Sequence, residues 1–187
     1  MRKRPPLLAL LPVVTLLAAC QTLPPREEML ALGCSHAPCR EAGALQLHDD
    51  EGRVQTFHVP AGPVFAGGIL SIVLGETHYL GISHEGTDDG RLKMQWMNAS
   101  DRGEADLRLT LQRISTGDGY VSRLTIHNQL DHALWLEAEQ FPVNQDRFYP
   151  LSLPPVPAQR RVHREWPHTI LEVQLTGIRR LDPARRP

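Results

Sequence analysis

The sequence has few cysteines and few aromatic residues, and it has no strong excess of charge of either sign. Its 187 residues include three cysteines and 5% aromatic residues, and the formal net charge is −1. The near balance of charge argues against a general electrostatic affinity for nucleic acid, so we expect no nucleic-acid partner. The length fits one ordinary domain or at most two small ones.

The motifs of common catalytic and cofactor sites are missing. The sequence contains no nucleophile elbow, no phosphate-binding glycine loop and no dinucleotide fingerprint. The segment HREWPH, His163 to His168, resembles a zinc-protease motif only superficially, because its histidines are five apart instead of four and Pro167 breaks a helix. We expect Trp166 to pack under a loop and Glu165 to pair with an arginine. The sequence thus predicts no catalytic residue, no metal ligand and no cofactor.

The nine histidines make a metal-handling or hydrolytic function the alternative to a non-enzymatic binding or assembly role. His78 and His84 share one face of an expected strand, but lie roughly 20 Å apart, too far to share a metal. His127 and His132 flank an expected hairpin and could meet across its turn. Together with the methionines of strand 92–97 they would offer a copper-type ligand set. Histidines that are solvated or cap a turn are far commoner than such a site, so the alternative stays second.

The apolar run near the start of the chain is short. Arg2, Lys3 and Arg4 are followed by residues 7–19, which are apolar except for Pro12 and Thr15. In a helix, thirteen residues span roughly 20 Å, less than the roughly 30 Å of a bilayer's hydrocarbon core. A positive start, a short apolar stretch and small residues at its end are typical of a secretory signal.

The end of this signal carries a more specific pattern. Leu17-Ala18-Ala19-Cys20 resembles the lipobox of bacterial lipoproteins, in which a leucine, two small residues and a cysteine mark the cleavage site. The resemblance implies that Cys20 becomes the first residue and carries lipid, which anchors the chain to a membrane. In that family an aspartate after the cysteine favours the inner membrane. Gln21 stands there instead, so we expect the outer membrane, with the protein facing the periplasm.

With Cys20 acylated, Cys34 and Cys39 remain as a pair. Four residues lie between them in a chain expected to face an oxidising compartment, which favours a structural disulfide. Such a short loop stabilises a fold by roughly 2 kcal/mol in the chain-entropy model. The spacing differs from that of thioredoxin-like motifs, and a zinc site would need a second ligand pair.

Short alternating runs dominate the rest of the chain. Residues 25–33 predict one short helix, with Pro25 at its start and Gly33 as its stop. In LRLTLQRI, the leucines at 107, 109 and 111 alternate with polar residues, as in a half-buried strand. Ten such strands are expected, at residues 44–48, 53–59, 69–74, 77–84, 92–97, 107–114, 120–127, 133–139, 147–153 and 169–175.

These strands predict a mainly β fold, an antiparallel sandwich of immunoglobulin-like size with a short N-terminal helix. The Cys…Trp…Cys arrangement of antibody domains is missing, so the likeness is one of architecture. We expect a signal peptide over residues 1–19, a lipidated tether over 20–24, one domain over 25–178 and a flexible basic tail over 179–187. The proline-rich stretch 153–157 is expected to cover a sheet edge.

Taken together, these features predict a lipid-anchored, non-enzymatic binding or assembly module at the membrane–periplasm boundary. Its expected partners are the membrane, through the N-terminal lipid, and an envelope protein or cell-wall component. Edge strands and the proline-rich stretch are natural contact surfaces. Arginines at 160, 161 and 164, and those of the tail, could form a local anion-binding patch, although a solvated tail is the commoner outcome.

Overall fold

The computed structural model describes residues 34, 38–48, 53–84, 90–117, 119–143 and 145–181. Within these ranges the elements are β1 (Cys39–Arg40), β2 (Gly43–His48), β3 (Val54–Val59), β4 (Gly62–Pro63), β5 (Phe65–Ala66), β6 (Ile69–Val73), β7 (Thr77–His84), β8 (Arg91–Trp96), the 3-10 helix η1 (Ala99–Glu104), β9 (Leu107–Thr116), β10 (Gly119–Asn128), β11 (Leu134–Pro142), β12 (Tyr149–Leu151), β13 (Arg161–Trp166) and β14 (Ile170–Arg180).

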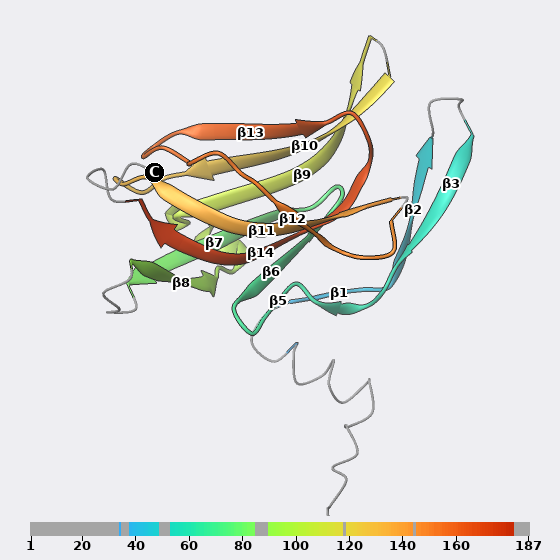
Figure 1. The fold of residues 1–187 in the computed structure, drawn as a ribbon. Helices are drawn as coiled ribbons and strands as arrows, with labels where there is room; N and C mark the ends of the chain where they lie inside the picture. The colour runs from blue at the N-terminus through green and yellow to red at the C-terminus, as the bar shows by residue number, and fades with distance from the viewer. Residues whose placement is uncertain are drawn as a thin grey trace, which may run out of the picture.

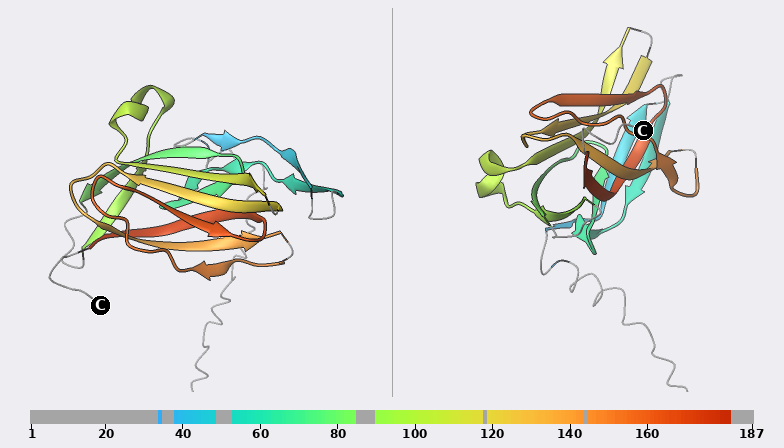
Figure 2. Two further views of the ribbon diagram at one scale, coloured as in Figure 1. Left: turned by 90° about the horizontal axis from the view of Figure 1, so that it is seen from above. Right: turned by 60° about the vertical axis from the view of Figure 1, so that its left-hand side comes forward.

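The fold is mainly β, and its strands pair antiparallel in a sandwich-like arrangement (Figure 1), which confirms the predicted fold class. The main sheet has the order β12-β11-β14-β8-β7-β9-β10-β13, and β6 also pairs with β14. β14 therefore has β11 on one edge and both β6 and β8 on the other. Figure 2 shows that the sheet curls over, so that its two ends approach each other around the core.

The alternation seen in the sequence builds this core. In β9, Leu107, Leu109 and Leu111 are all buried, and Leu124 and Ile126 of β10 lie opposite Leu111 and Leu109. They belong to one hydrophobic cluster with residues of β6, β7, β8, β11 and β14. Since every strand contributes its inward face to the same cluster, the described strands of the main sheet share a single core.

The proline-rich stretch covers an edge, as predicted. Val156 forms a two-way backbone bridge with Leu134 of β11, and both residues are fully buried. The side-chain amide of Asn128 also donates to the carbonyl oxygens of Val156 and Pro157. These hydrogen bonds satisfy backbone groups of the proline-rich stretch and of the part of β11 around Leu134, with which β12 does not pair.

Several parts of the fold differ from the expectation. β13 (Arg161–Trp166) pairs with β10 over its full length, although no strand was predicted there. β14 continues to Arg180, so Arg179 and Arg180 belong to the sheet and not to a tail that begins at 179. The strand expected over 147–153 is shorter, and η1 was not predicted.

The N-terminal predictions fall mostly outside the described residues. This applies to the lipobox at 17–20 and to the helix at 25–33. The predicted Cys34–Cys39 disulfide is present, with 5.3 Å between the two Cα atoms. Among the residues that the structure describes, no helix is long and apolar enough to cross a membrane.

Candidate functional site

A two-stranded ribbon stands beside the main sheet. β2 and β3 pair only with each other, and Figure 1 shows them at one end of the sandwich. Because opposite residues of an antiparallel pair share a face, Leu47 and Gln55 lie on the same face as Leu45 and Phe57. Leu45 and Leu47 pack against the edge of the core, so this face is turned toward the sandwich.

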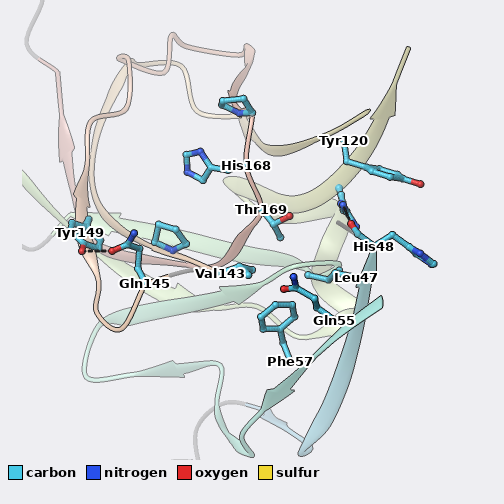
Figure 3. Close-up of a pocket in the computed structure, with 13 residues that line it drawn as sticks. Leu47, His48, Gln55, Phe57, Tyr120, Val143, Gln145, Tyr149, His168 and Thr169 are labelled. Carbon is cyan, nitrogen blue, oxygen red and sulfur yellow. Dashed lines mark hydrogen bonds between the residues drawn. The ribbon is translucent and has the colours of Figure 1, made fainter. Parts of the chain in front are cut away.

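A hollow of about 560 Å³ lies between the ribbon and the end of the sandwich. This volume falls within the range of small-molecule sites. Figure 3 shows Leu47, Gln55 and Phe57 from the ribbon on one side, and His168 on another. The lining comprises Leu47, His48, Gln55, Phe57, Arg113, Tyr120, Pro142, Val143, Gln145, Tyr149, Pro167, His168 and Thr169.

The lining mixes apolar and aromatic side chains with polar ones, and none of the described polar side chains is acidic. Leu47, Phe57 and Val143 are half-buried and supply the apolar surface. Tyr149 donates its hydroxyl to the side-chain oxygen of Gln145, 2.7 Å away, which holds one wall in place. No aspartate or glutamate lines the hollow among the described residues. A ligand that carries negative charge would therefore meet no repulsion from the described part of the lining.

Arg113 of β9 is the one arginine of this lining. Its guanidinium carbon lies 3.9 Å from the centre of the Tyr120 ring, and one of its NH2 groups donates to the carbonyl oxygen of His48. These contacts fix the guanidinium between the hairpin of β9 and β10 and the end of the ribbon. Its buried Nε has no hydrogen-bond partner, and no described acidic side chain pairs with its charge. The guanidinium is thus held in place by Tyr120 and His48 and has no acidic partner among the described residues.

The segment HREWPH is structural, as expected from its sequence. Trp166 is 4% exposed and belongs to the core cluster, and Glu165 accepts a hydrogen bond from Arg123 at 2.6 Å. His163 lies on the exposed strand β13, whereas His168 follows β13 and borders the hollow. The two histidines therefore do not form a joint site on a helix.

The other histidine and methionine candidates are dispersed. His78 is buried beside Trp96, with 5.3 Å between the two ring centres, and Met94 is buried in the core. His127 lines a separate hollow on the outer face of the sheet, whereas His132 bonds to Asp131. Among the described residues, no three His, Cys, Asp or Glu side chains come close enough to hold a metal ion.

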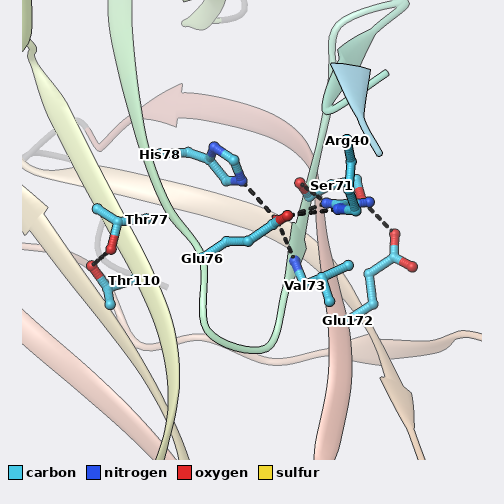
Figure 4. Close-up of polar contacts among 8 residues, drawn as sticks. All are labelled: Arg40, Ser71, Val73, Glu76, Thr77, His78, Thr110 and Glu172. Carbon is cyan, nitrogen blue, oxygen red and sulfur yellow. Dashed lines mark hydrogen bonds and ion pairs between the residues drawn. The ribbon is translucent and has the colours of Figure 1, made fainter. Parts of the chain in front are cut away.

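A second polar cluster surrounds Glu76, in the turn between β6 and β7 (Figure 4). Arg40 donates to both carboxylate oxygens, at 2.6 and 2.7 Å, and the backbone N–H of Val73 and the ring of His78 add contacts at 2.8 and 2.9 Å. Arg40 also donates to Ser71. Since Arg40 follows the disulfide residue Cys39, this cluster fastens the disulfide loop to the sandwich.

The same contacts control the ionisation of Glu76. Burial by itself raises the pKa of this carboxyl, but hydrogen bonds from Arg40, His78 and Val73 outweigh burial and lower the pKa from 4.5 to about 2. The carboxylate stays ionised at neutral pH and is fully occupied by donors from the protein. Its role is therefore to join elements of the fold.

Of the residues that line the hollow, sequence reasoning singled out only Pro167 and His168, as part of HREWPH and not as part of a binding site. The lining residues come from four separate stretches of the chain, at 47–57, 113–120, 142–149 and 167–169. The local sequence predicted only that Leu47 and Phe57 lie on two strands, at residues 44–48 and 53–59. Comparisons of the chain with protein-family models, curated protein sequences and solved structures found no match.

Proposed function

We propose that this protein is a lipid-anchored module of the bacterial cell envelope that binds an amphipathic anionic ligand in the hollow beside the β2–β3 ribbon. The observation that carries this proposal is the lining of the hollow, which combines half-buried apolar and aromatic side chains with the guanidinium of Arg113. Among the residues that the structure describes, this lining contains no acidic side chain, and no acidic partner pairs with Arg113. Such a site favours a ligand with an apolar or aromatic body and a carboxylate, sulfonate or phosphate group.

The ligand would be held at two places. Its apolar body would replace water against Leu47, Phe57 and Val143, each of which is only half-buried without it. Its anionic group would lie at the guanidinium of Arg113, which Tyr120 and His48 hold in a fixed position. Because an immobilised side chain loses little entropy on binding, this arrangement is favourable for recognition.

Anilinonaphthalene sulfonate, which joins an aromatic body to one negative charge, tests this proposal. We expect the full chain to bind one molecule of this dye with enhanced fluorescence. Arg113→Gln should weaken the affinity about tenfold, because a charge-assisted contact contributes roughly 1.5–3 kcal/mol. Gln55→Trp, which fills the hollow from the ribbon face that is turned toward the sandwich, should weaken it by a similar factor.

Arg160→Gln is the matched control, because Arg160 is exposed and lies outside the lining of the hollow. It removes the same charge and should leave the affinity within twofold. Equal weakening by Arg113→Gln and Arg160→Gln would show that the dye responds to overall charge, and would refute the assignment of the hollow.

The anchor rests on the lipobox resemblance at Cys20. In a bacterium with two membranes, we expect the chain to incorporate labelled palmitate and to stay with the outer membrane through a high-salt wash. Cys20→Ser should remove the label and release at least about nine tenths of the chain, because two or three acyl chains provide the attachment. Gln21→Asp should keep the label but move the chain to the inner membrane. Unchanged membrane retention of an unlabelled Cys20→Ser chain would contradict the lipid anchor.

A further inference from the structure

The outer face of the sheet carries a row of basic side chains that the proposed ligand site does not use. In the strand register, Arg108 of β9 lies opposite His127 of β10, and His127 lies opposite Arg161 of β13. On the other side of Arg108, Tyr79 of β7 completes the row. Side chains that are directly opposite on neighbouring strands have Cβ atoms about 4.5–5.5 Å apart, so the three basic groups are near neighbours.

These charges are not neutralised within the sheet. Arg108 and Arg161 flank His127 in the register, and no described acidic side chain forms an ion pair with either arginine. Elsewhere on the same face an arginine has an acidic partner, because Arg123 of β10 forms an ion pair with Glu165 of β13 at 2.5 Å. Among the described residues, one arginine of this face thus has an acidic partner, whereas Arg108 and Arg161 have none.

The row borders a shallow hollow of about 220 Å³. Arg108, His127 and Arg161 line it together with Gln112, Thr110 and Thr125, and no acidic residue of the described chain does. The volume equals that of roughly seven water molecules at about 30 Å³ each, enough for a phosphate group and part of the molecule that bears it. All its side chains can donate hydrogen bonds, which matches the acceptor oxygens of phosphate.

The aromatic ring at the end of the row orients one of the arginines. The guanidinium carbon of Arg108 lies 5.8 Å from the centre of the Tyr79 ring, and that of Arg102 in η1 lies 5.1 Å from it. A cation over a ring face is held by the ring's quadrupole. Arg108 is therefore positioned before any ligand arrives, and Arg102 adds positive charge to that end of the row.

We propose that this row is a phosphate-binding site, in which Arg108 and Arg161 hold one phosphate group from two sides. His127 and the hydroxyl of Thr125 donate to its oxygens from the sheet between them, while the hydroxyl of Thr110 shares a hydrogen bond with that of Thr77. The site is independent of the hollow beside the ribbon, because the two linings share no residue. The phosphate group belongs either to a small soluble phosphate or to a phospholipid headgroup, and both present the same oxygens to the site.

Calorimetric titration of the full chain in a neutral detergent tests the site with two probes. Inorganic pyrophosphate represents a soluble phosphate, and glycerophosphoglycerol represents a lipid headgroup without its acyl chains. We expect saturable binding of at least one probe with a Kd below about 1 mM at low salt, weakening as salt rises. The probe that binds more tightly identifies the source of the phosphate.

Arginine variants locate the binding. Arg108→Gln and Arg161→Gln should each weaken the affinity at least about tenfold, because each removes charge-assisted hydrogen bonds to the phosphate. Arg164→Gln is the matched control for Arg161→Gln. It removes the same charge from the same strand, but Arg164 lies opposite the buried Leu124 and thus on the other face. It should leave the affinity within twofold.

A measurement on the unaltered chain makes the test independent of variant folding. Nuclear magnetic resonance should show that the bound probe shifts the ring signals of His127, while those of His58 on the distant ribbon stay in place. Saturable binding with these shifts supports the site. No saturable binding of either probe, an unshifted His127 ring, or equal weakening by Arg161→Gln and Arg164→Gln overturns it.

Discussion

Replacement of Glu76 by glutamine is expected to lower the free energy of unfolding by about 3 kcal/mol at pH 7. The fall of its pKa from 4.5 to about 2 corresponds to roughly 1.4 kcal/mol per unit of favourable interaction with the ionised form. The variant also leaves the guanidinium of Arg40, which is 14% exposed, without its charge partner. Urea unfolding of the full chain, followed by tryptophan fluorescence without reductant, measures the effect.

The pH dependence distinguishes this effect from a loss of packing. The pKa of Glu76 is lower in the folded state than in the unfolded state, so its contribution is complete above about pH 5 and is lost as the pH falls toward 2. The difference in stability between the wild type and Glu76→Gln should therefore shrink over this interval. A difference that stays constant from pH 7 to pH 2 would show that the carboxylate's charge does not stabilise the fold.

Glu165→Gln provides the comparison for Glu76→Gln. Its partner Arg123 is 34% exposed and Glu165 itself is 42% exposed, so water screens this ion pair. Exposed pairs contribute about 0–1 kcal/mol. We expect Glu165→Gln to change the free energy of unfolding by less than about 1 kcal/mol at every pH. A loss as large as that of Glu76→Gln would contradict the distinction between the two sites.

Replacement of Trp166 by alanine is expected to cost about 3–5 kcal/mol of stability. Trp166 ends β13, lies opposite the buried Ser122 and is 4% exposed within the core cluster. Its removal leaves a cavity that the closely packed core can fill only in part. Chemical unfolding at pH 7 measures the loss, and Trp166→Phe, which retains most of the volume, should lose considerably less.

His163→Ala is the control on the same strand. His163 is exposed and lies outside the core, so its removal should change stability by less than about 0.5 kcal/mol. Together the two variants test the interpretation of HREWPH as a structural segment. A small loss for Trp166→Ala combined with a large loss for His163→Ala would reverse that interpretation.

The sequence predicts strands well where one face of the strand is buried and the other is exposed to solvent. Leu107, Leu109 and Leu111 alternate with polar residues, and all three are buried as expected. The prediction fails for β13 because it lies at the edge of the sheet. Arg164 lies opposite the buried Leu124 and thus on the core side of the strand, although it is itself exposed. A charged residue at a position where an apolar one is expected interrupts the alternation of apolar and polar residues in the sequence.

The end of β14 was predicted too early for a different reason. The pairing of β14 with β11 shifts register between Glu137 and Ala138, which is a β-bulge or a similar irregularity. The buried positions consequently pass from Leu175 to Ile178, and the period of two is interrupted. In the sequence, Gly177 indicates the end of a strand, but in the structure β14 continues to Arg180.

The candidate sites depend on contacts between distant parts of the chain. Arg113 and Gln55 line the same hollow although 58 residues separate them in the sequence. The sequence predicts that each lies on or near a strand, but it does not fix how the ribbon docks on the sandwich. The disulfide is the exception, because Cys34 and Cys39 are close enough in the chain for their spacing to predict the pair.

The most direct test of the binding proposal is to locate anilinonaphthalene sulfonate on the full chain by nuclear magnetic resonance. The account predicts nuclear Overhauser contacts from the dye's aromatic protons to the methyl groups of Leu47 and Val143, which face the hollow, and loss of these contacts in Arg113→Gln. Contacts that fall instead on the exposed Ile69, outside the hollow, would contradict it.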